Sequence, residues 1–188
     1  MKLLSVNVGL AHERLIGQRK VLSAIDKRPV EGEVAVQPLG LAGDEQADPS
    51  VHGGLSKAVY AYPSEHYAFW RTVRAQAQVA GWDDSLPPGA LGENLTLEGV
   101  LEDGLYVGDR LVFPGCVLAV SEPRFPCFKF NAVMGFPQAS KLMAQSGFCG
   151  SYLAVIEPGT IAAGQRFELL PGPREVSIRE LFRARVRA

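Results

Sequence analysis

Glycine and proline interrupt this chain so often that they limit what it can fold into. Its 188 residues include 20 glycines and 13 prolines, which imply many turns and few long helices. Between the turns lie short segments with the alternating or continuous apolar patterns of strands, such as 2–8, 33–37 and 116–121. We therefore expect a mainly β (α+β) fold, a closed or nearly closed β-barrel with a few helices on its outside.

Few segments carry a helical pattern. Apolar residues recur at helical spacing over 67–77, and 137–146 predicts a short helix that ends before Gly147. Ser177 and Glu180 form a capping box that predicts a last helix, which is short and basic. The length suits one domain. We divide the chain into a barrel domain, 1–170, and a short helical tail, 171–188.

Composition narrows the classes of partner and compartment. The formal net charge is −1, so bulk charge indicates neither nucleic acid nor a membrane surface as a partner. No apolar run is long enough to span a bilayer, and the first residues lack a signal-peptide core. Three cysteines without a CxxC pair suggest neither a disulfide framework nor a zinc site. We expect a cytoplasmic protein, a monomer or a homodimer.

The stretch 121–131, SEPRFPCFKFN, contains the most reactive combination of residues. Two prolines precede Cys127 and two phenylalanines follow it, with Arg124 three residues before it and Lys129 two residues after it. The prolines predict a stiff extended loop rather than a helix. Neighbouring cations favour the thiolate, which attacks electrophiles or binds soft metals. The alternative interpretation is that Cys127 is a small buried hydrophobic residue.

A long polar, glycine-rich stretch, 39–57, is the second candidate. Asp44 precedes His52-Gly53-Gly54 and Lys57. Gly53 and Gly54 would let the backbone approach a ligand, and Lys57 would provide a charge for a phosphate. His52 would be a hydrogen-bonding residue, a base or a turn residue. The alternative is a structural hairpin loop.

Other polar residues carry weaker signals. Glu93 and Asn94 follow a glycine, and the local pattern favours the solvent-facing start of a strand. His66 is expected on the surface or at a helix cap. Cys116 and Cys149 are expected to be structural.

Together these motifs resemble the MOSC domain, named after the C-terminal domain of molybdenum cofactor sulfurase. The resemblance covers 27–170 in the family's order and is closest to the stand-alone bacterial YiiM-like branch. That branch commonly has a three-helix extension, of which 171–188 would supply about one helix. The motifs are 40–63, GENLT at 92–96, Gly108-Asp109, EPRFPC at 122–127 and GSY at 150–152.

The resemblance implies a MOSC-type β-barrel that binds the molybdenum cofactor, a pterin dithiolene with a terminal phosphate. Cys127 would coordinate molybdenum, and His52 and Asp44 would line the catalytic site. The substrates would be N-hydroxylated compounds such as hydroxylamino-purines, amidoximes and hydroxamates, with electrons from a flavin- or iron–sulfur-containing donor. Pyridoxal phosphate binding is also associated with the family. The implied cofactor-binding residues are Arg124, Lys57, Gly53, Gly54, Glu93, Asn94 and Lys129.

Two other functions stay open. The chain would act as a carrier if Cys127 delivers the cofactor, or sulfur as a persulfide, to another enzyme. It would act as a thiol enzyme if Cys127 is a nucleophile with His52 as its base.

Overall fold

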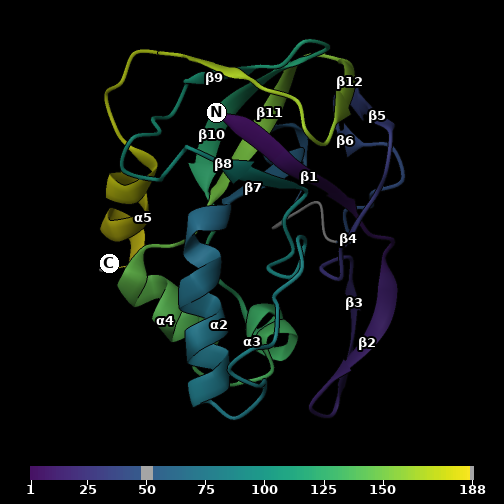
Figure 1. Ribbon diagram of the computed structural model, residues 1–188, viewed down its shortest axis with the longest axis vertical. Helices are drawn as coiled ribbons and strands as arrows, with labels where there is room; N and C mark the ends of the chain where they lie inside the picture. Colours follow the sequence, from purple (N-terminus) through teal and green to yellow (C-terminus); the bar gives the residue numbers. More distant parts are fainter. Residues whose placement is uncertain (48–52, 187–188) are drawn as a thin grey trace.

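The protein is described from a computed structural model, which covers residues 1–47 and 53–186. Strands dominate it, with short helices below and beside them (Figure 1). The prediction of a mainly β fold with a few helices is confirmed. The strands are β1 (Lys2–Val8), β2 (His12–Ile16), β3 (Arg19–Ser23), β4 (Arg28–Pro29), β5 (Glu33–Gln37), β6 (Gly40–Leu41), β7 (Val59–Pro63), β8 (Leu95–Glu98), β9 (Arg110–Val112), β10 (Val117–Pro123), β11 (Ser151–Glu157), β12 (Gly159–Ala162) and β13 (Glu168–Leu170). The helices are η1 (Leu55–Lys57), η2 (Ser64–His66), α2 (Tyr67–Gln76), α3 (Phe128–Met134), α4 (Ala139–Ser146) and α5 (Ile178–Val186).

The main sheet has eight strands in the order β13-β9-β10-β11-β7-β8-β1-β4. All its pairs are antiparallel except β7 and β8, which run parallel with Ala61 opposite Leu95. Backbone hydrogen bonds also join β1 to the segment before β13, because the amide of Leu3 donates to Gln165 (2.9 Å) and that of Gly164 donates to Leu3 (2.8 Å). These bonds curve the sheet around the core, and closure into a complete barrel stays a prediction.

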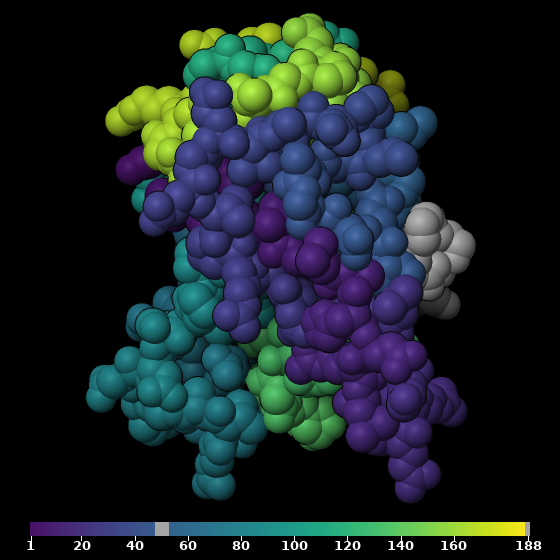
Figure 2. Space-filling view, turned by 90° about the vertical axis from the view of Figure 1, so that its right-hand side faces the viewer, coloured from purple at the N-terminus to yellow at the C-terminus, as the bar shows by residue number. Residues whose placement is uncertain are grey.

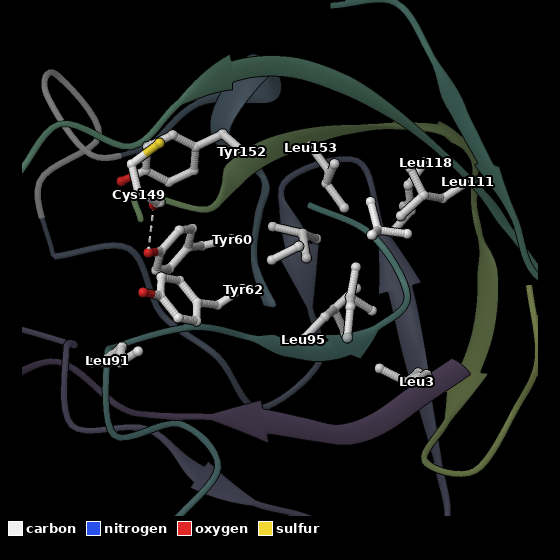
Figure 3. Close-up of a cluster of buried hydrophobic side chains, with 14 of the residues drawn as sticks. Leu3, Tyr60, Tyr62, Leu91, Leu95, Leu111, Leu118, Cys149, Tyr152 and Leu153 are labelled. Carbon is white, nitrogen blue, oxygen red and sulfur yellow. Dashed lines mark hydrogen bonds between the residues drawn. The ribbon is translucent and has the colours of Figure 1, made fainter. Parts of the chain in front are cut away.

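The core lies inside this curve. Figure 3 shows the strands surrounding leucine side chains at one end and the rings of Tyr60, Tyr62 and Tyr152 at the other. Every residue of β7 is buried, as expected for a strand covered on both faces. The tyrosine end of the core adjoins the helices, and there the polar side chains gather.

The stretch around Cys127 differs from the prediction. Strand β10 continues to Pro123, and α3 starts at Phe128, directly after the cysteine. The prolines impose extended backbone only on 122–126. No proline occurs between Cys127 and Gly135, so a helix can form there. Gly135 ends α3 in a left-handed conformation. The prediction of a continuous loop over 121–131 was therefore wrong at both ends, since 121–123 belong to β10 and 128–131 to α3.

Other local predictions held closely. Helix α4 ends at Ser146, before a left-handed Gly147. Ser177 and Glu180 bond to each other as a capping box does, with the Glu180 amide donating to the Ser177 hydroxyl (3.2 Å) and the Glu180 carboxylate accepting from the Ser177 amide (2.9 Å).

Candidate functional site

One open cleft, about 630 Å³ including its mouth, lies where the sheet meets the helices. Its described lining comes from the turn after β3, the segment after β6, η1, β7, the turn before β8, the end of β10, the start of α3 and the start of β11. Gly92 lets the turn before β8 pack closely against the turn after β3, because its φ is +84° and a Cβ there would lie 2.6 Å from the Ile25 side chain. Segments far apart in the sequence therefore meet around one hollow.

Cys127 lines this cleft and is half-buried. It is the N-cap residue of α3, with extended backbone. Its carbonyl accepts hydrogen bonds from the amide of Phe130 (2.9 Å) and the hydroxyl of Ser140 (3.1 Å). These bonds hold the thiol at the point where the extended chain turns into a helix.

The other two cysteines lie in different surroundings. Both are buried, and neither lines the cleft. Burial raises the pKa of Cys116 to about 11 and the pKa of Cys149 well above its usual range. Both are therefore neutral thiols at physiological pH, as their predicted structural role requires.

Arg124 is only 5% exposed, yet it lines the cleft. Its guanidinium lies 4.9 Å from the ring centre of Tyr60 and 5.2 Å from that of Phe130. The Tyr60 hydroxyl donates to the carbonyl of Cys149 (2.8 Å; Figure 3), which fixes one of these rings. Among the described residues, Nη1 of Arg124 has no hydrogen-bond partner. A buried donor without a partner is costly, so this atom is suited to an anionic ligand.

Lys57 and Lys129, two of the predicted cofactor-binding residues, line the same cleft. Nζ of Lys57 is 3.7 Å from the carboxylate of Glu122. Nζ of Lys129 donates to the carbonyl of Leu22 (2.9 Å). With Arg124, they give the cleft three of its positive charges.

Lys27 is the fourth cation of the cleft, and sequence reasoning did not select it. Its side chain is 8% exposed, and its ammonium binds the carboxylate of Asp44. Burial lowers the pKa of Lys27, and the charge of Asp44 opposes that shift. The only signal in the sequence was a lysine before a short edge strand, which is too common to identify a buried ion pair.

Asp44 and Asn94 also line the cleft, and they join segments to one another. The Asp44 carboxylate accepts from the amide of Gly9 (2.8 Å) and from the side-chain amide of Asn94 (2.8 Å). The Asn94 carbonyl oxygen accepts from the amide of Tyr60 (3.0 Å). Both residues therefore shape the cleft while contributing polar atoms to it.

Glu93 points away from the cleft and is fully buried. Its carboxylate accepts hydrogen bonds from the Tyr67 hydroxyl, the Thr96 hydroxyl (2.9 Å) and the amides of Gly89 (2.8 Å) and Leu91 (3.1 Å). Burial raises the pKa of Glu93, and the hydrogen bonds from Tyr67, Gly89 and Thr96 oppose the shift. The expected solvent-facing position of Glu93 and Asn94 was wrong, because the strand after them lies in the middle of the sheet.

The remaining predicted residues lie elsewhere. Gly54 has a φ of +87°, and its amide donates to the side chain of Gln46 (2.8 Å). Neither Gly53 nor Gly54 belongs to the described lining of the cleft. His52 lies outside the described residues. His66 is the N-cap residue of α2, which confirms the helix-cap alternative, but it is buried rather than exposed, because its Nε2 binds Glu102 (2.7 Å) and its ring stacks on Phe148.

Comparisons with known proteins identify the family of this chain. The model of the MOSC domain matches residues 48–168. Protein YiiM of Escherichia coli is 38% identical over 159 residues, which are 84% of this chain and 68% of that protein.

The chain belongs to the MOSC domain family.

Two further relatives extend the comparison. The crystal structure of YiiM from Geobacillus stearothermophilus has a TM-score of 0.77 and 32% identity, and the match covers 98% of this chain and 83% of that one. A protein named reductase from Gibberella moniliformis is 34% identical over 188 residues, 97% of this chain but 32% of its own length. The chain is thus YiiM-like, and its family relates it to the molybdenum cofactor.

The residues of this MOSC cleft fit that cofactor. One half-buried thiol lines the cleft, and thiolates are ligands that soft metals prefer. The Arg124 nitrogen without a described partner suits a phosphate or a pterin carbonyl. No group of three or more His, Cys, Asp or Glu side chains in 1–47 and 53–186 is arranged to hold a metal ion. Of the three cysteines, Cys127 is the one that lines the cleft. In the same part, no helix is long and apolar enough to cross a bilayer.

Proposed function

We propose that this chain is a molybdenum-cofactor-dependent reductase of N-hydroxylated compounds, such as hydroxylamino-purines, amidoximes and hydroxamates. The observation that carries the proposal is the cleft in which the half-buried Cys127 adjoins Arg124, a buried cation with a donor nitrogen that lacks a described partner. The name of the Gibberella moniliformis relative supports the reductive direction.

The overall reaction would be R–NHOH + 2 H⁺ + 2 e⁻ → R–NH2 + H2O. The N–O bond breaks, one proton completes the amine, and the other completes the water molecule. When bound, the cofactor supplies two-electron chemistry at molybdenum, and the protein supplies binding and electrostatics. The electrons would come from a separate flavin- or iron–sulfur-containing protein.

Each cleft residue has a role in this proposal. The Cys127 thiolate would hold the metal. The planar guanidinium of Arg124 would donate hydrogen bonds to an anionic or carbonyl group of the pterin. Lys57 and Lys129 would add positive charge around the phosphate. Asp44 and Asn94 would keep the cleft in shape through their contacts with Gly9 and Tyr60. No such role follows for Glu93, because its carboxylate is sealed inside the fold.

The test is to purify the protein from a molybdate-fed host that makes the cofactor, then to measure molybdenum by elemental analysis and pterin by fluorescence. We expect about one molybdenum per chain, reduction of benzamidoxime with reduced methyl viologen, and loss of both in Cys127→Ala. The matched control is Cys116→Ala, which removes a buried thiol outside the cleft. Absence of metal and pterin from the unmodified protein would defeat the proposal.

The same experiment separates the other two functions. A carrier would bind the cofactor or hold a persulfide on Cys127 without turning over benzamidoxime. A thiol enzyme would lose its activity to iodoacetamide in the absence of any bound metal. Pyridoxal phosphate binding would give its own absorbance and stays a family-level expectation.

A further inference from the structure

The hairpin β2–β3 projects from the body of the protein. Within the described residues its two strands pair only with each other, as a separate two-stranded sheet. It hangs at the lower right in Figure 1 and projects at the lower right in Figure 2. A hairpin that only covered the core would not need to extend so far into solvent.

One face of the hairpin carries two exposed leucines beside an ion pair. The register places Glu13 opposite Leu22 and Leu15 opposite Lys20, and alternate residues of a strand share a face. Leu15 is 68% exposed and Leu22 is 49% exposed. The opposite face carries Arg14, which binds both oxygens of Asp26 at 2.5 and 2.7 Å. The leucine face also carries Glu13 and Lys20, whose side chains form an ion pair (3.4 Å), and no other described strand pairs with the hairpin.

This face adjoins the cleft. The ammonium of Lys129 donates to the carbonyl of Leu22, which joins the hairpin to α3. Phe128, the residue after Cys127, is 54% exposed. Ser23 and Ile25, at the end of the hairpin, line the cleft itself. A molecule seated on Leu15, Leu22 and Phe128 would therefore lie at the mouth of the site.

The surroundings of this face are positively charged. Residues 12–30 contain five Lys or Arg and two Asp or Glu, whereas the whole chain has a formal net charge of −1. Three of these cations have a carboxylate partner, Arg14 with Asp26, Lys20 with Glu13 and Lys27 with Asp44, whereas the exposed Arg19 and Arg28 have none among the described residues. The side chain of Lys20 is 76% exposed. An apolar centre within a charged rim is the usual anatomy of a protein interface, and a cationic rim selects an acidic partner.

The proposed reaction needs electrons that this chain is poorly equipped to supply. An iron–sulfur cluster of the common type takes four cysteine ligands. The chain has three cysteines, two of them buried in the core. The described cysteines are therefore too few for such a cluster, and the proposed function takes its electrons from a separate protein.

We infer that Leu15, Leu22 and Phe128, with the cations of the β2–β3 hairpin, form the docking surface for an acidic electron-transfer protein. The need for an electron donor follows from the proposed function, on which this inference rests. The position of the docking surface and the negative charge of the partner follow from the hairpin itself. The partner carries a flavin or an iron–sulfur group and approaches with its negative face.

The probe is flavodoxin, an acidic flavoprotein, tested against the cofactor-loaded protein. The hairpin variant is Arg19→Glu/Lys20→Glu, and the control is Arg71→Glu/Lys141→Glu, which changes the net charge equally at exposed positions of α2 and α4. At low ionic strength we expect the hairpin variant to raise the apparent KM for reduced flavodoxin and the Kd for oxidised flavodoxin by about tenfold. Added salt should shrink this difference, and turnover with methyl viologen should not change.

Several results would overturn the inference. These are equal effects of the two variants, failure of flavodoxin to bind while methyl viologen supports turnover, or a dimer of the unmodified protein that the hairpin variant dissociates in sedimentation. The last result would identify the surface as a contact between two copies of the chain. If methyl viologen gives no turnover with molybdenum bound, the proposed function fails instead. The Kd for oxidised flavodoxin, measured by calorimetry, still tests the docking surface in that case.

Discussion

Lys27 and Asp44 show how the cleft combines binding with stability. Both side chains are more than nine-tenths buried, and each is the other's charged partner. The remaining contacts of Asp44, with Gly9 and Asn94, are hydrogen bonds from neutral groups. Removing one charge of a buried pair leaves the other without compensation.

Asp44→Asn is expected to destabilise the protein by about 3–5 kcal/mol, because Lys27 loses its counter-ion in a buried site. Urea unfolding measures this change. The control is Asp26→Asn, which removes a half-exposed partner of Arg14 and should cost less than about 1 kcal/mol. The double variant Lys27→Met/Asp44→Asn should recover part of the loss. Equal effects of Asp44→Asn and Asp26→Asn would contradict this account.

The pH dependence of Lys27 has a definite sign. Burial lowers its pKa in the folded protein below the ordinary 10.5. Between the lowered pKa and 10.5 the unfolded chain binds the extra proton, so the free energy of unfolding should rise with pH in this window. Unfolding measured from pH 7 to 10 should show a rise that Lys27→Met reduces. An identical slope in the variant would show that another group titrates.

Helix α5 packs against the stretch of chain that precedes Cys127. The amides of Ile178 and Arg179 donate to Leu105 (2.8 Å) and Glu102 (3.0 Å), which anchors the start of the helix. In the middle of the helix, the fully buried Phe182 stacks on Phe125, two residues before Cys127, with 5.5 Å between ring centres. The helix thus supports the stretch that carries Arg124 and Cys127.

Phe182→Ala is expected to cost about 3–5 kcal/mol by opening a cavity in the core. It should also speed the alkylation of Cys127 by iodoacetamide in native buffer, because the stretch before the thiol loses its support. The control is Val186→Ala, an exposed change in the same helix, which should alter stability by about 0.5 kcal/mol or less. A loss of stability with unchanged alkylation would show that α5 does not hold the cysteine in place.

Asn94 connects distant parts of the whole molecule. Its side chain bonds to Tyr60, Asn7 and Asp44, which lie 34, 87 and 50 residues away along the chain. Strands β1, β7 and β8 and the segment after β6 are therefore fastened at one point, beside the cleft.

Asn94→Ala is expected to destabilise the protein by about 3 kcal/mol, because it removes three hydrogen bonds and leaves the buried amide of Tyr60 without its acceptor. Urea unfolding and faster hydrogen exchange of the Tyr60 amide measure this effect. Thr72→Ala is the control, since that hydroxyl bonds only within exposed α2 and its loss should change stability little. If Tyr60 stays fully protected, the amide has found another acceptor.

The sequence by itself determined the family, the mainly β composition and most element positions, because these depend on local spacing and on motifs that are read in order. It also identified Cys127, Arg124, Lys57, Lys129, Asp44 and Asn94, which the fold brings to one cleft. Only the tertiary structure decided that Lys27 joins them, that Glu93 turns inward, and that α3 starts directly after the cysteine. Burial and charge pairing depend on residues dozens of positions apart, and a local pattern carries no information about such contacts.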